Sequence, residues 1–506
     1  MAESADFSPP TAPVLERPAT GPRRDVALAI RRAPIVGPAL TIAVGVVAAM
    51  WIAFFVVHLP AIAPLSPAPV AGSLLLAIML VGVTLGCSRV PAGQGTLVGA
   101  LAGLFLALIN LLILGSYLTR PLDTGADAGP NQAAAGVQGI RPDAALMIGG
   151  FVLFSVIVGI VGGLIGAALA RRRGTGPESA QTWLARLAAA TCFAIVPLLA
   201  LGGLVTSTGS GLAVPDWPGT YGANMVLYPI GLMSSSERVF LEHSHRLFGA
   251  MVGLCAGLTF AYSIYALLMV GRKKLLLVGL ALVVLVGVQG ALGGARVIEG
   301  VQKYGKEWPQ YLAVAHGVLA QAYFALSVAF AVACGPRWDA ARNAALAGAP
   351  EAGPPGARGA ARWLLPTLVI CIFTQLIFGA LYRHTHSLHP LWAHVGFSIV
   401  VLGFAHASAV WSLRQKNGGR PFRRGGLALM HAVNLQFVLG LIALLLVLGT
   451  DKPTGVASPD AVANGADTLS TRELWTGAVR TVHQANGALV LAAGVGVLMW
   501  SRTRKT

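Results

Sequence analysis

Charged residues are scarce in this sequence, and their scarcity excludes an ordinary soluble fold. Only 11% of the 506 residues are charged and 55% are hydrophobic, whereas about a quarter of the residues in a soluble domain are charged. The net charge of +17 is spread along the chain and not pooled in one domain, so it does not indicate a nucleic-acid partner. We therefore expect membrane lipid to surround the chain.

Cysteine is also rare. All five cysteines lie in or at the ends of hydrophobic runs, which excludes the disulfide framework of a small secreted domain: Cys87, Cys192, Cys255, Cys334 and Cys371. A cleavable signal peptide is not apparent either, because acidic residues and prolines occupy the first 25 residues in place of a short apolar core. We expect residues 1–35 to form a cytoplasmic tail.

Long apolar runs are what the sequence has in abundance. Because unpaired backbone groups are prohibitive in hydrocarbon, runs that span a bilayer can only be helices, and this predicts an all-α, polytopic membrane bundle. Twelve runs reach about the 20 residues that a crossing needs, at 36–58, 70–87, 96–117, 145–170, 183–205, 241–270, 273–293, 311–335, 364–382, 391–412, 425–449 and 477–501.

Basic residues alternate between the connections in the way that sets membrane orientation. With the N-terminus inside, the inner segments hold 25 Lys and Arg and the outer segments hold 10, while Arg246 lies within a helix. We expect a multi-pass protein of the cell (inner) membrane with both termini in the cytoplasm.

The last eight predicted helices contain an internal repeat. The string from Leu201 (LGGLVTSTGSGL) corresponds to that from Ile377 (IFGALYRHTHSL), and VQGALGG from Val288 corresponds to LQFVLGL from Leu435. In each half, an outgoing helix precedes a return helix with histidine. A second outgoing helix with Gln and Gly then precedes a second return helix with histidine.

This pattern divides the chain into five parts and makes the last eight helices pseudo-symmetric. We expect the cytoplasmic tail (1–35), an N-terminal four-helix membrane region of unassigned role (36–170), a first four-helix repeat (183–335), a cytoplasmic linker (336–363) and a second four-helix repeat (364–501).

Four histidines occupy matching places in the two repeats. Each lies about three to six residues inside the predicted outer start of a helix, at one shared depth: His245, His316, His394 and His483. Ionisable residues inside a membrane are costly and generally functional. Two parallel helices that each present an imidazole at one level suit a flat metal macrocycle, with one ring on each face of the iron. We therefore expect two heme sites, one per repeat.

Other interpretations of these histidines stay open. A single histidine at a helix end is more often an interfacial residue, and only its repetition at four equivalent positions favours ligation. Zinc is the competing metal, but it needs three or four clustered ligands, and no cysteine accompanies these histidines.

Two charged residues accompany the first histidine. Glu242 lies three residues before His245 and therefore on the same helix face. It is either a proton-transfer group or an acid that complements the helix dipole. Arg246 either meets a heme propionate or pairs with Glu242.

These residues carry a resemblance to a known family. The segments GLVTSTGSGLAVPDWP (Gly203 to Pro218), EHSHR (Glu242 to Arg246), QGALGG (Gln289 to Gly294) and the histidine of VAHGVLAQ resemble heme A synthases over roughly residues 183–501. The combination of the PDWP loop with E-x-x-H-R is specific, whereas the motifs of the second repeat are weaker.

The resemblance implies an oxidoreductase that converts the C8 methyl of heme O to the formyl of heme A for terminal oxidase assembly. It implies that Glu242 is catalytic, that His245 and His316 hold the substrate heme iron with Arg246 nearby, and that His394 and His483 hold a permanent heme b. Heme O synthase and terminal oxidase subunits are the implied partners, and homo-oligomerisation stays open.

The chain departs from the family pattern in three places. It lacks the cysteine pair that some bacterial members carry near Ala213 and Val214, so a thiol relay is excluded. The second His-Arg pair is His394-Val395 here, and the four N-terminal helices match nothing in the family.

Two other classes of function compete with the enzyme. A heme-binding electron carrier or heme-handling protein would keep the fold without the oxidation, and Glu242 distinguishes it because electron transfer needs only the iron ligands. A small-molecule transporter would explain the parallel repeats but gives no reason for four matched histidines.

The charge distribution makes a prediction about orientation. A reporter fused after Thr506 should be active in the cytoplasm, because the inner segments hold most of the basic residues. Periplasmic activity of the same fusion would reverse the orientation of every loop.

Overall fold

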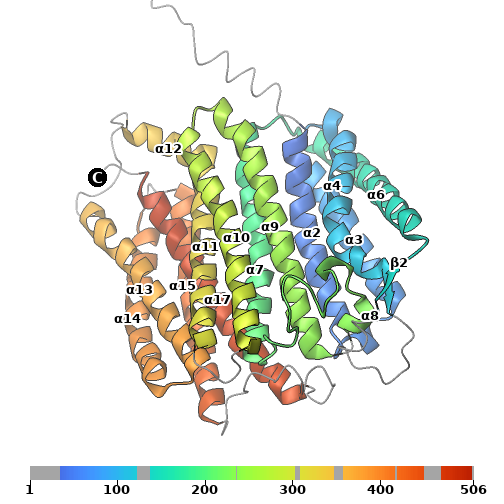
Figure 1. Ribbon diagram of the computed structural model, residues 1–506. Helices are drawn as coiled ribbons and strands as arrows, with labels where there is room; N and C mark the ends of the chain where they lie inside the picture. The colour runs from blue at the N-terminus through green and yellow to red at the C-terminus, as the bar shows by residue number, and fades with distance from the viewer. Residues whose placement is uncertain are drawn as a thin grey trace, which may run out of the picture.

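The apolar runs of the sequence form helices that cross the molecule side by side (Figure 1). The computed structural model describes residues 35–121, 137–234, 236–302, 308–346, 357–415, 419–449 and 469–503. Among these residues, twelve helices are long and apolar enough to cross a membrane, which confirms the predicted all-α polytopic bundle. Nearly all of the predicted tail, part of the predicted linker and both termini lie outside the described residues.

Four helices precede the repeats and pack with one another: α2 (Val36–His58), α3 (Ala68–Cys87), α4 (Gly95–Leu114) and α6 (Ala144–Arg173). Short elements connect them. These are the 3-10 turns η1 (Ala63–Leu65), η2 (Ala92–Gln94) and η3 (Gly115–Tyr117) and the antiparallel strands β1 (Thr119–Pro121) and β2 (Val137–Ile140).

Each repeat is a closed ring of four helices. In the first, α7 (Ala180–Ser207), α9 (Glu237–Met269), α10 (Lys273–Gln302) and α11 (Trp308–Ala333) contact one another in that order, and α11 returns to α7. The second ring has the same order, with α13 (Ala357–Thr385), α14 (Leu388–Leu413), α15 (Gly419–Leu448) and α17 (Thr471–Ser501).

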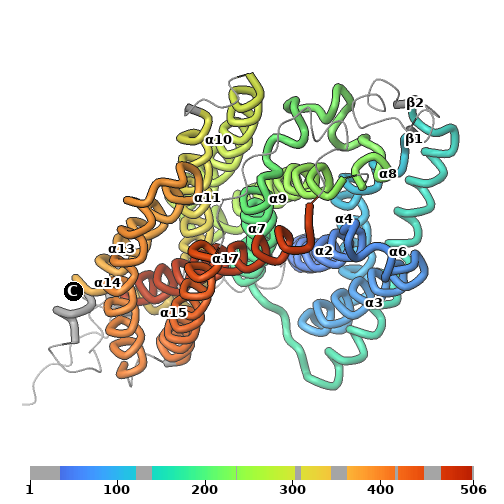
Figure 2. The backbone as a smooth tube through the Cα atoms, turned by 90° about the horizontal axis from the view of Figure 1, so that it is seen from below, coloured from blue at the N-terminus to red at the C-terminus, as the bar shows by residue number. Residues whose placement is uncertain are grey.

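The first and last helices of each ring join the two repeats. Helix α17 packs against α7 and α11, and α11 also packs against α13 (Figure 2). The remaining short elements are η4 (Met225–Leu227) and α8 (Ile230–Met233), between α7 and α9, and α12 (Pro336–Leu346). Helix α12 occupies the start of the segment that we expected to be a linker.

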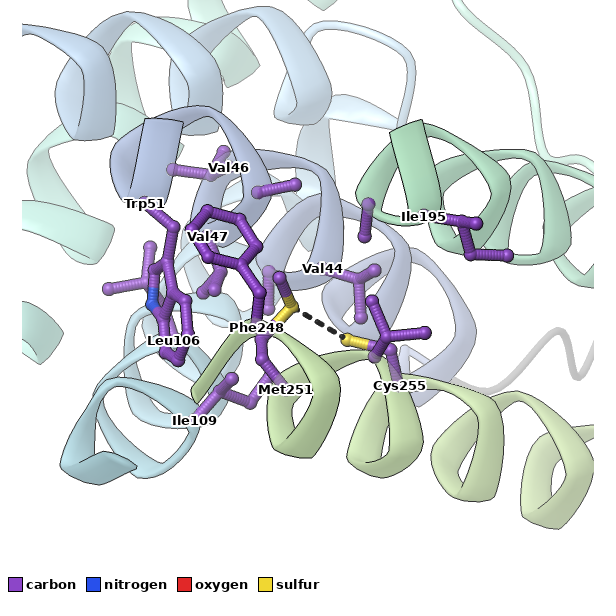
Figure 3. Close-up of a cluster of buried hydrophobic side chains, with 14 of the residues drawn as sticks. Val44, Val46, Val47, Trp51, Leu106, Ile109, Ile195, Phe248, Met251 and Cys255 are labelled. Carbon is purple, nitrogen blue, oxygen red and sulfur yellow. Dashed lines mark hydrogen bonds between the residues drawn. The ribbon is translucent and has the colours of Figure 1, made fainter. Parts of the chain in front are cut away.

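The N-terminal helices dock on the first repeat, through α2 and α4 against α7 and α9 (Figure 2). Trp51 of α2 is fully buried in this interface and meets Phe248 of α9 edge to face, with ring centres 5.2 Å apart (Figure 3). Its indole N–H donates to Asn110 Oδ1 of α4 at 2.8 Å. Without this bond the indole nitrogen would be buried with no hydrogen-bond partner.

Local signals set the helix ends. Helix α6 ends at Gly174, whose φ of 62° is the left-handed conformation that glycine adopts without strain. Helix α7 begins after Ser179, whose hydroxyl accepts from the Thr182 N–H. A complete capping box of Ser470 and Glu473 begins α17.

Helices α4 and α6 approach each other along a seam of glycines. A Cβ on Gly99 would stand 2.2 Å from the Gly159 carbonyl oxygen, and one on Gly159 would stand 2.3 Å from that of Gly99. Gly103 and Gly163 make similar approaches one turn away. Because lipid supplies no hydrophobic drive between helices, such close backbone contact is what holds them together.

The glycine seam predicts a stability effect. Gly159→Val should destabilise the protein by roughly 2–3 kcal/mol or prevent its assembly, because the added atoms overlap backbone. Gly150→Val, on the same helix but with no neighbour within 4 Å of its Cβ position, is the matched control. Thermal unfolding in detergent should separate the two variants, and equal midpoints would refute the seam.

Candidate functional site

The four predicted histidines lie on the four return helices α9, α11, α14 and α17. These helices start earlier than the hydropathy indicates, at Glu237, Trp308, Leu388 and Thr471. His394 lies six residues inside its helix, within the expected three to six, whereas His245, His316 and His483 lie eight, eight and twelve residues inside. Polar first turns such as that of α17 extend the helices beyond the apolar run. All four histidines are half-buried.

A glycine on the preceding outgoing helix lies against each imidazole. In each pair, the histidine Cε1 is the atom nearest to the position that a Cβ on the glycine would take. The distance is 2.9 Å for Gly202–His245, 3.2 Å for Gly293–His316, 3.0 Å for Gly379–His394 and 3.2 Å for Gly440–His483. An alanine at these positions would force the ring or the helix to shift. The glycines therefore set the position of the histidine rings.

A glutamine lies one helical turn before the glycine in three of the four pairs. Gln289 and Gln375 donate from Nε2 to the backbone carbonyls of His316 and His394, at 2.9 and 2.8 Å. Gln436 Nε2 lies 3.2 Å from His483 Nδ1. Because Gln and Gly are four residues apart, they share one helix face and hold the histidine together.

The second repeat brings its two histidines into contact. The rings of His394 and His483 have centres 6.2 Å apart and planes at 79°. His394 Nδ1 lies 3.0 Å from the Gln375 carbonyl oxygen, a contact that assigns the proton to Nδ1 and leaves Nε2 with a free lone pair.

In the first repeat, His245 and His316 lie within electrostatic range of each other and of Arg296 on α10. The Nδ1 atoms of His245 and His316 are buried, with no hydrogen-bond partner among the residues that the structure describes. Both repeats thus place their two histidines close together, as the internal repeat predicts.

Glu242 and Arg246 hold the loop of residues 208–222. Glu242 is buried, and it accepts from the Val214 N–H at 2.9 Å and from Arg246 at 2.8 Å. Arg246 also donates to the carbonyls of Val214, Asp216 and Gly219 at 2.7 to 2.9 Å. Of the two alternatives for Arg246, the pairing with Glu242 is therefore the one observed.

Helix α10 holds the other side of the 208–222 loop. The indole of Trp217 lies where a Cβ on Gly294 would stand, and Leu212 packs similarly on Gly300. Arg296 donates to the Gly211 carbonyl at 2.5 Å. Since Gly294 directly follows the glycine under His316, the loop and this histidine rest on neighbouring residues of one helix.

The 208–222 loop also has internal hydrogen bonds. Asp216 accepts from the N–H groups of Tyr221 and Gly222 at 2.7 and 2.9 Å. The Tyr221 hydroxyl donates to the Ala213 carbonyl. Burial, with a smaller contribution from the Glu242 carboxylate, raises the pKa of Tyr221, so this donor stays protonated across the physiological pH range.

Arg383 connects the two repeats at the level of the histidines. From α13 it donates to the Gly203 carbonyl at 2.7 Å and to Ser207, both on α7, and to the side chain of Gln484 on α17. Gly203 follows the glycine under His245, and Gln484 follows His483. Arg383 therefore contacts one residue beside the His245 site of the first repeat and one residue beside His483 of the second repeat.

The sequence interpretation missed several of these residues. We counted Arg238, Arg296, Arg383 and Arg480 with the outer segments, but all four lie within helices. The available signal was that these arginines lie close to the predicted helix ends, with Arg480 inside the predicted helix 477–501. The paired Gln and Gly of the outgoing helices were visible in the repeat, but their contact with the histidines was not.

These observations define the class of the protein: an integral membrane protein built of two histidine-bearing four-helix rings with an N-terminal helical unit. A family described as cytochrome oxidase assembly protein matches residues 185–396. Over this segment, which is less than half of the chain, the sequence is similar to that family.

Several relatives carry the name heme A synthase. The protein of Methylorubrum extorquens (strain PA1) is 34% identical over 201 residues, 35% of this chain and 48% of that protein. That of Methylorubrum populi is 29% identical over 54% of this chain and 80% of its own length, and that of Granulibacter bethesdensis is 28% identical over 61% and 87%. The chain thus spans about half the length of the Methylorubrum extorquens protein. No solved structure matches the chain significantly.

The contacts of Arg246 predict a change in loop stability. Arg246→Ala should accelerate amide exchange in the 208–222 loop about tenfold or more, because hydrogen bonds to a charged group contribute ~1.5–3 kcal/mol each. Arg472→Ala, at an exposed position on α17, is the control. Unchanged exchange in Arg246→Ala would show that this residue does not hold the loop.

Proposed function

We propose that this protein is a heme A synthase, an oxidoreductase that converts the C8 methyl of heme O to the formyl of heme A for terminal oxidase assembly. The observation that carries the proposal is the pair of matched histidine sites, of which one lies beside the held loop and its buried carboxylate. The family match and the names of the relatives support it. We place the protein in the inner membrane with both termini in the cytoplasm.

The second repeat fits a bis-histidine heme, which we assign as heme b. A metal–nitrogen bond of roughly 2 Å on each side, plus about 1 Å from each nitrogen to its ring centre, separates two axial imidazoles by roughly 6 Å. The centres of His394 and His483 are 6.2 Å apart. The described residues contain no group of three or more His, Cys, Asp or Glu that could hold a metal ion, which makes zinc the poorer fit.

The first repeat fits the substrate, heme O. His245 and His316 supply two imidazoles, whose buried Nδ1 atoms have no hydrogen-bond partner within bonding geometry among the described residues. Arg246 and Arg296 place two cations beside this site, and both fit the carboxylates of a heme. Heme O synthase would supply the substrate, and terminal oxidase subunits would receive the product.

Glu242 is the residue to which we assign the chemistry. Oxidation of a methyl group to a formyl group adds one oxygen atom, from water, and releases four protons and four electrons. A bound heme would supply the redox chemistry, with an external acceptor taking the electrons, and Glu242 would accept a proton. Arg246 and the Val214 N–H each use one lone pair of a separate Glu242 oxygen, so each oxygen keeps a second lone pair to accept a proton. The same two contacts fix the direction of the carboxyl group.

The ligand assignment in the second repeat predicts a spectroscopic loss. His394→Ala and His483→Ala should each remove the low-spin bis-histidine heme from the absorption spectrum, because each leaves one axial position without its imidazole. His406→Ala is the control, since His406 lies on the same helix as His394 but bonds Asn434 and the Leu402 carbonyl. Unchanged spectra and heme content in both ligand variants would show that this repeat does not hold heme.

The assignment of Glu242 predicts a loss of conversion with the fold intact. Glu242→Gln keeps the shape of the side chain and a carbonyl oxygen for one of its two donors, the Val214 N–H or Arg246, but is a far weaker proton acceptor. In cells supplied with heme O, it should bind heme and accumulate heme O or its alcohol, with heme A reduced by at least about 100-fold, the usual scale of an acid–base contribution.

The same variant distinguishes the enzyme from a heme-handling protein. Hemes would be extracted from purified Glu242→Gln and wild-type protein and identified by mass, and the bound-heme spectrum recorded beforehand. Wild-type amounts of heme A in the variant would remove Glu242 from the reaction. Loss of all bound heme would make its role structural.

A further inference from the structure

A groove of about 570 Å³ opens between the N-terminal helices α2 and α3 and helix α7 of the first repeat. It lies away from the histidine sites, on the half of the molecule that the charge distribution assigns to the cytoplasm. Thr41 and Ala49 mark its extent along α2. Eight residues of helix rise about 12 Å, close to the thickness of one leaflet of hydrocarbon, roughly 15 Å.

The groove is amphipathic along its length. The end of the groove nearer the bilayer centre is lined by small and aliphatic residues such as Gly45, Ala49 and Val81. Val81 is exposed on the surface of the protein. The other end holds Arg89, Arg186 and the ring of Trp183. An apolar channel that ends in cations and an indole matches a lipid acyl chain below its head group.

The mouth of the groove has an uncompensated positive charge. Glu178 pairs with Arg186, at 2.7 Å for one of the two contacts, and Arg186 stacks on Trp183 at 4.6 Å. Among the residues that the structure describes, Arg89 and Arg173 have no carboxylate partner, and Arg173 donates to Ser88 beside Arg89 at 3.0 Å. Two cations therefore remain for an anionic ligand.

We infer that this groove binds an anionic phospholipid of the surrounding leaflet, with an acyl chain along α2 and the phosphate between Arg89 and Arg173. The phosphate of a zwitterionic head group carries its own cation, so such a lipid would leave a net positive charge at the two arginines, whereas an anionic head group reduces it. The lipid fills the groove that α2, α3 and α7 leave open, and it thereby contacts both the N-terminal helices and the first repeat. This gives the N-terminal unit a lipid-binding role that is independent of heme.

Native mass spectrometry of the full-length protein tests this inference. Delipidated protein would be titrated with dioleoyl phosphatidylglycerol or dioleoyl phosphatidylcholine, and thermal unfolding measured on the same samples. The anionic lipid should bind and raise the unfolding midpoint, whereas phosphatidylcholine should do neither. Arg89→Gln should weaken phosphatidylglycerol binding about fivefold, since a basic residue near the surface contributes ~1 kcal/mol.

Two further variants locate the lipid. Gly45→Leu should abolish the binding by filling the groove, and its first added atom meets only Ala190, at 3.9 Å. Arg414→Gln, at an exposed position on the inner side of the second repeat, should bind as the wild type does.

Three outcomes would overturn the inference. Equal binding of the two lipids would exclude recognition of charge, and equal losses in Arg89→Gln and Arg414→Gln would exclude a local site. Recovery of a neutral isoprenoid quinone in place of phospholipid, lost in Gly45→Leu, would assign the groove to a different ligand.

Discussion

The close approach of four imidazole rings to four glycines is the contact on which the bundle depends. Each ring lies where any larger residue would place a Cβ, from Gly202 under His245 to Gly440 under His483. Because the glycine and the histidine belong to successive helices, each contact fixes both the separation and the rotation of one helix pair. Two such pairs of helices pack against each other to make each ring.

The two repeats share this framework but differ in what surrounds it. The 208–222 loop is bonded to α9 through Glu242 and Arg246 and to α10 through Arg296, whereas only His386 and Ser387 separate α13 from α14. The held loop lies beside the first site and suits a site that exchanges its ligand. The short turn lies beside the second site and suits a site that retains its ligand. Arg383 contacts both repeats between these sites.

The sequence predicted the helices well, because hydropathy is a property of the chain alone. The internal repeat indicated the four matching histidine positions, and their role as heme ligands stays a prediction. It left Arg246 with two roles, since spacing does not show that its guanidinium would reach three loop carbonyls. Arg383 was read as an outer residue because its contacts come from helices about 100 and 180 residues away in sequence. Helix starts were placed too late, because polar first turns lower the local hydropathy.

The central claim is that one chain holds two different hemes in two homologous sites. The most direct measurement is the amount and identity of heme per polypeptide in purified wild-type protein, by acid extraction and mass spectrometry against a quantified protein standard. The account predicts close to two hemes per chain, one of them heme b and the other heme O, its alcohol or heme A. A single heme b per chain, with neither heme O nor its oxidation products detected in cells that make heme O, would contradict it.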